Sequence, residues 1–178
     1  CSQSRGLGDV YKRQMKIRSF LVIFAMSSLL HSEENFGIVV HGGAGVMSGL
    51  SEERQQQIHK KIQETVSEAY EILEKGGSSL DAVELAVSML EDSPLFNAGR
   101  GSVYNSDEVQ EMDASIMDGK NRLSGAVASV TSVKNPIKLA RKVAEETKHV
   151  LLMGEGAERF AKDIGVDICL LYTSPSPR

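Results

Sequence analysis

A glycine-rich stretch, His41-Gly-Gly-Ala-Gly45, follows an apolar run, and its residue types could bind an anion. Without β-carbons, the backbone N–H groups of such a loop can closely approach a negatively charged group. The same residues would also form a tight turn that binds no ligand. The stretch lacks both the Gly-Lys-Ser/Thr ending of a phosphate-binding P-loop and the spacing of a dinucleotide-binding loop. Anion binding and a simple turn therefore both remain open.

A second candidate is Pro94-Leu-Phe-Asn-Ala-Gly-Arg-Gly101, whose Asn97 carries both a hydrogen-bond donor and an acceptor. We expect Leu95 and Phe96 to pack into the core. The Asn97 amide could contact a substrate, or it could make the local hydrogen bonds that are typical of a turn.

A third stretch, Met112-Asp-Ala-Ser-Ile-Met-Asp-Gly119, alternates like a strand and has Asp113 and Ser115 on one face. Two acids and a serine could serve metal or hydroxyl chemistry. We favour a structural role, with Asp118-Gly119 as a hairpin turn and Asp113 as a buried carboxylate that accepts backbone hydrogen bonds. The histidines are scattered in the sequence, and none of them falls in a cluster with zinc-ligand spacing.

The elements that must position these motifs alternate between helix and strand, which predicts a mixed α/β class. We predict a buried strand at residues 36–40, followed by two helices that begin after the capping residues Ser51 and Ser78. The first of these helices ends at Gly76-Gly77. The inward positions predicted for the second helix are Val83, Ala86, Val87 and Leu90. The later elements predicted are strands at residues 108–117 and 123–133, a helix from its cap Asn135 and Pro136 to residue 147, a strand at 150–153 and a helix at 155–163.

The two ends of the chain are related to each other through the DNA that could encode them. Residues 4–14 can be encoded by a DNA string whose reverse complement, read one base in, encodes residues 169–178. That string resembles a sequencing-library transposon adapter, so we expect residues 1–14 and 169–178 to be adapter-derived. Both cysteines, Cys1 and Cys169, lie in these ranges, which leaves no disulfide framework. Without the tails, which carry a net charge of +3, the net charge is −7 rather than −4. Such an acidic chain is unlike a nucleic-acid binder.

Residues 15–34 have the pattern of a signal peptide. Lys16 and Arg18 follow Met15, and residues 20–30 form an apolar run that is too short to span a bilayer comfortably. We therefore expect an exported, periplasmic protein. If this run is instead a buried N-terminal element, the protein would be cytoplasmic.

Taken in order, the three motifs resemble the N-terminal half of the isoaspartyl peptidase/L-asparaginase family, the plant-type asparaginases. Members of that family are N-terminal-nucleophile hydrolases, which cut their own chain to expose a catalytic threonine. The resemblance implies an αββα four-layer sandwich, of which residues 35–168 would form the N-terminal half. It also implies that His41, Gly42 and Gly43 lie beside the nucleophile and that Asn97 lies near the active site.

The resemblance further implies a structural sodium ion, and it implies no cofactor for catalysis. The ion would be bound by backbone carbonyl groups of one loop, and such hard oxygen ligands suit it. Carried over residue by residue, these carbonyls belong to Leu90, Glu91, Ser93, Phe96, Ala98 and Arg100.

The implied reaction is hydrolysis of L-asparagine or of isoaspartyl dipeptides through a threonine acyl-enzyme. The nucleophile would lie beyond this chain, in a C-terminal β subunit from the same precursor, so we expect no catalytic residue here and an inactive fragment. The resemblance also implies a dimer of αβ units. A glycosylasparaginase of the same superfamily is the nearest alternative. An amino-acid kinase-like phosphate-binding domain is an alternative from another class, and it rests on the glycine loop alone.

Overall fold

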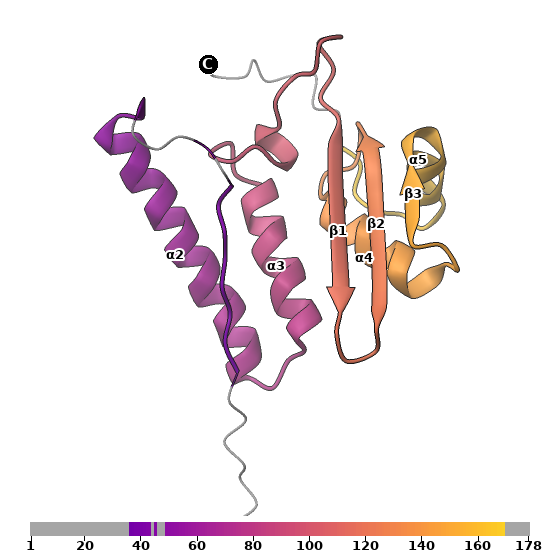
Figure 1. Cartoon of the computed structure of the whole chain (residues 1–178), viewed down its shortest axis with the longest axis horizontal. Helices are drawn as coiled ribbons and strands as arrows, with labels where there is room; N and C mark the ends of the chain where they lie inside the picture. The colour runs from indigo at the N-terminus through magenta and orange to yellow at the C-terminus, as the bar shows by residue number, and fades with distance from the viewer. Residues whose placement is uncertain (1–35, 44, 46–48, 170–178) are drawn as a thin grey trace, which may run out of the picture. The chain divides into compact units, whose positions relative to one another are not determined.

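The computed structural model describes residues 36–43, 45 and 49–169 (Figure 1). The chain divides into two units, Cys1–Phe36 and Gly37–Arg178, and every element described below belongs to the second. The predicted signal peptide and the first adapter-derived range lie outside the described residues, as does the second range apart from Cys169. None of the helices in the described part is long and apolar enough to cross a membrane.

The described elements combine helices with one small sheet, which confirms the predicted mixed α/β class. The sheet has the strand order β1-β2-β3, with β1 antiparallel to β2 and β3 parallel to β2. Because the described residues contain this single sheet, the four-layer αββα sandwich stays a prediction. The elements are, in order, α2 (Glu52–Glu74), α3 (Ser79–Glu91), the short 3₁₀ turn η2 (Gly99–Gly101), β1 (Met112–Asp118), β2 (Leu123–Val130), α4 (Pro136–Glu146), β3 (Leu151–Met153) and α5 (Gly154–Asp163).

The first two helices begin where their caps were predicted. Ser51 Oγ accepts a hydrogen bond from Arg54 N at 3.2 Å, and Ser78 Oγ accepts one from Asp81 N at 3.1 Å. These bonds satisfy backbone donors that a helix leaves free in its first turn. Gly76, with a φ of +78°, follows the end of α2 in a conformation that favours glycine.

Small residues set how α2 packs against α3. The buried alanines Ala69, Ala82 and Ala86 form the contact, and Ile38 and Val40 pack against it. The prediction that Val83 faces inward is wrong, because its side chain is 41% exposed. The buried stripe of α3 follows Ala82 and Ala86 at a spacing of four residues, and Val83 lies one residue, about 100°, away from that stripe.

The prediction of a buried strand at residues 36–40 is also wrong. Residues 37–40 are not assigned to any strand of the described sheet, and Val39 is 96% exposed, whereas Ile38 and Val40 are half-buried. A strand needs a neighbour to satisfy its backbone groups. The alternation of exposure along the segment shows that only one of its faces has a packing partner here, and Figure 1 shows the segment running alongside α2 and α3.

The chain has two packed layers: α2 with α3, and the sheet with α4 and α5. The core of the second layer lies between the sheet and α4. Its buried members include Ile116 and Val127 from the strands and Ile137 and Val143 from the helix, and α5 adds two alanines. Gly125 of β2 is the point of closest approach, because a β-carbon there would lie 2.5 Å from Ala144 N and collide with the carbonyl oxygen of Ala140. The helix can therefore rest on the strand only while this residue has no side chain.

Substitution of Gly125 by alanine tests this close approach. We expect G125A to lower the free energy of unfolding by about 3 kcal/mol, because the added methyl group meets helix backbone that cannot rotate away. The measurement is urea-induced unfolding followed by circular dichroism. G119A is the matched control, since a β-carbon at Gly119 meets nothing within 4 Å. Equal stabilities of the two variants would contradict the proposed packing.

Candidate functional site

The four residues that sequence motifs assigned to an active-site neighbourhood lie around one pocket. His41, Gly42, Gly43 and Asn97 all line a cavity of about 730 Å³, together with apolar side chains of α2 and α3. The glycine loop and the loop after α3 are more than 50 residues apart in sequence, so only the packing of α2 on α3 brings them together.

The glycine loop has an internal hydrogen bond that orients its histidine. The N–H of Gly43 donates to His41 Nδ1 at 3.1 Å. Because Nδ1 accepts this bond, a neutral imidazole carries its proton on Nε2. Gly43 has a φ of +102°, and a β-carbon there would meet nothing within 4 Å. A glycine is therefore required here by the backbone conformation and not by a lack of space for a side chain.

Gly42 has the opposite reason to be a glycine. A β-carbon at this position would lie 2.9 Å from Ile62 Cδ1 and 3.1 Å from Phe96 Cε1. Both distances are shorter than ordinary van der Waals contact. The glycine loop thus rests directly on a side chain of α2 and on the buried ring of Phe96.

Asn97 lies at the mouth of the pocket with its amide partly committed. Its Oδ1 accepts a hydrogen bond from Val103 N at 2.9 Å, which closes the loop that contains η2. The side chain is exposed, and its Nδ2 donates no hydrogen bond that the structure records among the described residues. Both interpretations of Asn97 therefore have a structural basis: its oxygen stabilises the turn, and its NH₂ group is a donor on the pocket wall.

The loop after α3 directs several carbonyl oxygens toward two glycines. A β-carbon at Gly99 would collide with the carbonyl oxygen of Glu91, and one at Gly101 would collide with that of Phe96 and lie 3.1 Å from that of Ser93. Neutral oxygens gathered where no side chain intervenes have the chemistry of an alkali-cation site. The Ala98 carbonyl accepts the N–H of Gly101 and keeps a second lone pair, whereas the Leu90 carbonyl accepts the N–H groups of both Asp92 and Ser93. Arg100 lies within η2.

The Glu91 side chain has a role that the sequence analysis did not foresee. Its carboxyl group is buried, with the residue 3% exposed, and Oε1 accepts a hydrogen bond from Ile137 N at 3.0 Å. Glu91 therefore supplies the side-chain cap of α4. Asn135 is, as predicted, the N-cap residue of this helix, and its carbonyl oxygen accepts a hydrogen bond from Lys138 N at 3.0 Å. The Asn135 side chain makes no capping bond; its Nδ2 donates instead to Asp92 Oδ1 at 3.2 Å. Burial raises the pKa of Glu91 to about 7, although the N–H of Ile137 acts in the opposite direction.

A signal for this role is present in the sequence. Glu91 is an acid in the last turn of a helix, where the helix dipole disfavours negative charge. A buried acid at such a position needs a hydrogen-bond donor from another part of the chain. The signal identifies the residue as unusual, but it does not name the donor, which lies 46 residues further along the chain.

Comparison with known proteins agrees with these motifs. A family model described as asparaginase matches residues 34–174. The chain belongs to the asparaginase family. The isoaspartyl peptidase/L-asparaginase of Rattus norvegicus is 53% identical over 129 residues, which cover 72% of this chain and 38% of the relative. The plant-type L-asparaginase of Pyrococcus furiosus is 56% identical over 128 residues, which cover 72% of this chain and 41% of the relative. The resemblance noted in the sequence is thereby confirmed, and the match spans about two-fifths of the length of these relatives.

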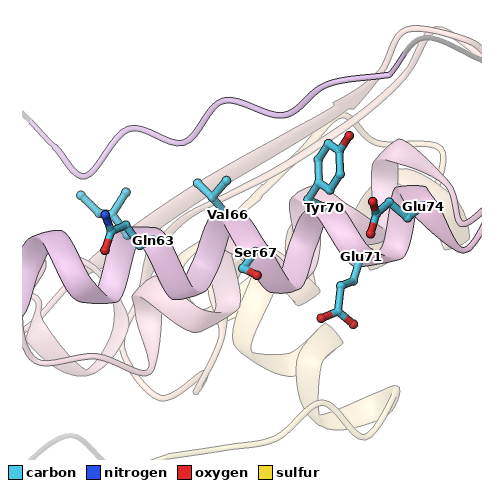
Figure 2. Close-up of a pocket in the computed structure, with 7 residues that line it drawn as sticks. Gln63, Val66, Ser67, Tyr70, Glu71 and Glu74 are labelled. Atoms are coloured by element: carbon cyan, nitrogen blue, oxygen red, sulfur yellow. The ribbon is translucent and has the colours of Figure 1, made fainter.

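A second hollow in this asparaginase-family chain, of about 500 Å³, lies along the surface of α2 (Figure 2). All of its lining residues belong to that one helix. Val66 and Tyr70 point to one side of the helix, and Ser67 and Glu71 point away from them. None of the predicted site residues lines this hollow. Within the described residues, no group of three or more histidine, cysteine, aspartate or glutamate side chains could hold a metal ion.

The third motif supplies structure rather than a catalyst. Asp113 is exposed, so the prediction that it is buried is wrong, but it does accept a backbone hydrogen bond, from Ser129 N at 2.8 Å. Ser129 has a φ of +51° at an irregularity in the register between β1 and β2. The carboxylate bonds the N–H that this bulge leaves unpaired, and for that purpose it lies on the exposed face of the hairpin.

Glu158 is a second carboxylate that the motifs did not single out for a role. Its Oε1 accepts hydrogen bonds from Thr131 N at 2.7 Å and Ser132 N at 3.0 Å, and its Oε2 accepts one from Ser132 Oγ. These bonds join α5 to the end of β2. Burial would raise the pKa of Glu158, but the hydrogen bonds outweigh that effect and lower the pKa below its usual value of 4.5.

The lowered pKa predicts how stability depends on pH. A carboxyl group with a lower pKa in the folded state contributes stability above its unfolded-state pKa, and that stability is lost as pH falls through the folded-state pKa. We expect E158Q to cost about 1–3 kcal/mol at pH 7, with the cost shrinking as the pH falls below 4.5. Urea unfolding at several pH values measures it.

The control for this variant is E155Q. Glu155 is 96% exposed and lies 3.7 Å from Arg159, so its removal should change stability little at any pH. A cost of E158Q that stays constant down to pH 3 would contradict the role assigned to the charged carboxylate.

The backbone role of Gly43 predicts a different outcome. We expect G43A to cost about 1–2 kcal/mol, because an alanine at this φ is strained even though its methyl group has room. G45A is the control, since a β-carbon there also meets nothing within 4 Å and the residue has no positive φ. Thermal unfolding of the two variants compares them, and equal midpoints would show that Gly43 tolerates a side chain.

Proposed function

We propose that this chain is the N-terminal part of an amidohydrolase that acts on L-asparagine, on isoaspartyl dipeptides or on both. The observation that carries the proposal is the convergence of His41, Gly42, Gly43 and Asn97 on one pocket in a chain of the asparaginase family. The relatives named isoaspartyl peptidase/L-asparaginase and plant-type L-asparaginase support the substrate class.

In the proposed reaction, a threonine outside this chain attacks the side-chain amide or β-aspartyl carbonyl. The hydroxyl group is activated by the free α-amino group of the same threonine, and hydrogen-bond donors stabilise the tetrahedral oxyanion. The acyl-enzyme is then hydrolysed by water. This chain would contribute one wall of the active site and no nucleophile.

The contribution of the glycine loop is positional. The N–H of Gly43 is occupied by His41 Nδ1, so this group does not serve as a free anion-binding donor. The side chains on the pocket wall that can still donate are those of His41, through Nε2–H, and of Asn97, through its NH₂ group. This arrangement favours a support for a neighbouring catalytic residue over a phosphate-binding cradle, and it therefore favours a hydrolase over a kinase.

The uncovered surfaces support a partner polypeptide, which we propose to be the C-terminal part of the same precursor. Met117 of β1 and Met153 of β3 lie on the sheet face opposite α4 and are 75% and 62% exposed, and Leu151 on the same face is 51% exposed. Val39, at 96%, is exposed on a segment without a strand partner. Apolar surface of this extent is typical of an interface, and the relatives carry more than half of their length beyond the matched region.

We also propose that the loop after α3 binds a structural sodium ion. The carbonyl oxygens of Glu91, Ser93 and Phe96 support this site, since that of Glu91 lies against Gly99 and those of Ser93 and Phe96 lie against Gly101, where no side chain intervenes. Leu90, Ala98 and Arg100 would complete the ligand set. The ion would stabilise the loop by offsetting the mutual repulsion of these oxygens, and it would take no part in the chemical step.

Expression of two proteins tests the proposed function. Residues 15–168 alone should release no ammonia from L-asparagine, because the nucleophile is absent, whereas the complete gene product should hydrolyse asparagine or a β-aspartyl dipeptide. DNA sequence beyond the codon for Ile168 should encode the threonine at a self-cleavage site. Ammonia release by residues 15–168, or a complete gene product that hydrolyses neither substrate, would overturn the proposal.

A further inference from the structure

Phe96 belongs to two parts of the site at once. Its ring lies against Gly42, since a β-carbon there would be 3.1 Å from Cε1 and 3.6 Å from Cδ1. Its carbonyl oxygen lies against Gly101, in the loop with the converging carbonyls. The residue is 7% exposed, so both ends of it are packed. One side chain and its own peptide group thus connect two loops that are otherwise separate in sequence.

The backbone on both sides of Phe96 is held by hydrogen bonds. Ser93 Oγ accepts a hydrogen bond from Leu95 N at 3.3 Å, and Asn97 Oδ1 accepts one from Val103 N at 2.9 Å. The guanidinium group of Arg54 donates to the Pro94 carbonyl at 3.3 Å, which ties the same loop to α2. A displacement of the Phe96 carbonyl group should therefore move the Phe96 ring as well, because the neighbouring residues cannot rotate freely to compensate.

The glycine loop is open on its other side. β-Carbons at Gly43 and Gly45 would meet nothing within 4 Å, whereas the three atoms nearest to one at Gly42 belong to Ile62 and Phe96. Ile62 lies within the 23-residue helix α2. Of these two residues, Phe96 is therefore the one that lies in a loop, and the conformation of that loop can change when a cation binds.

We propose that Phe96 is a positioning residue that couples the carbonyl-lined loop to the glycine loop, so that a cation in the first sets the position of Gly42 in the second. The inference rests on the sodium site proposed above, and it adds a consequence for the pocket. Packed interiors pass on small displacements because their atoms are in contact. Coupling of this kind acts in both directions, so a change that displaces Gly42 should also alter the affinity of the carbonyl-lined loop for the cation.

Glycine-selective ¹⁵N labelling of the complete protein allows both loops to be followed by NMR. Sodium chloride is titrated against N-methylglucamine chloride at constant ionic strength. In the wild-type protein we expect the amide signals of Gly99 and Gly101 to move with sodium, and those of Gly42 and Gly43 to move with the same midpoint. In F96L, which keeps the peptide group and shortens the side chain, only Gly99 and Gly101 should respond.

F160L is the matched control. Phe160 packs against the core from α5, so this variant makes the same substitution away from both loops and should keep both responses. Movement of Gly99 and Gly101 alone in the wild-type protein, or an unchanged response of Gly42 in F96L, would overturn the coupling and leave the sodium site standing. If no glycine in either loop responds to sodium, the sodium site itself fails, and the coupling fails with it.

A second variant tests the reverse direction and does not depend on F96L folding. In G42A the added methyl group meets both Ile62 Cδ1, at 2.9 Å, and the Phe96 ring, at 3.1 Å. Because the ring is displaced, we expect the apparent Kd for sodium, read from Gly101, to change by about fivefold. G45A, whose β-carbon meets nothing within 4 Å, should leave that Kd unchanged. An unchanged Kd in G42A would also overturn the coupling.

Discussion

A buried carboxylate joins the two packed layers of the described chain. Glu91 ends α3, which packs with α2, and its Oε1 accepts the hydrogen bond from Ile137 at the start of α4, which packs on the sheet. A hydrogen bond contributes about 0.5–1.5 kcal/mol between neutral groups and about 1.5–3 kcal/mol when one partner is charged, and removing one partner leaves the other buried and unsatisfied. The position of the loop after α3, relative to the sheet, depends on this contact.

The geometry of the candidate pocket depends on that loop. Glu91 directs its side chain toward α4 and its carbonyl oxygen toward Gly99, so one residue serves both the core and the proposed cation site. Phe96 extends the same connection to Gly42. Gly99 and Gly42 are both required by the close approach of other atoms. Gly43, in contrast, is required by its φ of +102°.

Local signals in the sequence were sufficient for most helix boundaries, and they failed where a side chain bonds far from its own segment. Ser51 and Ser78 were predicted as caps because a cap bonds a backbone N–H only three residues away. Asn135 also occupies an N-cap position, but its side chain makes no capping bond, and the buried Glu91 side chain accepts the N–H of Ile137 instead. Val83 was placed inward by periodicity, whereas the close packing of Ala82 and Ala86 sets the buried stripe.

The sequence by itself determined the α/β class, the order of the main elements and the membership in the asparaginase family, because these depend on periodicity, caps and contiguous motifs. It also named the four residues that line the pocket, although it contained no measure of the distance between them. Tertiary structure alone decided that Glu91 caps α4, that Asp113 bonds the bulge at Ser129 and that Phe96 lies against Gly42. Each of these contacts joins residues at least 16 positions apart, and such pairs are set by how helices and strands pack, not by any local pattern.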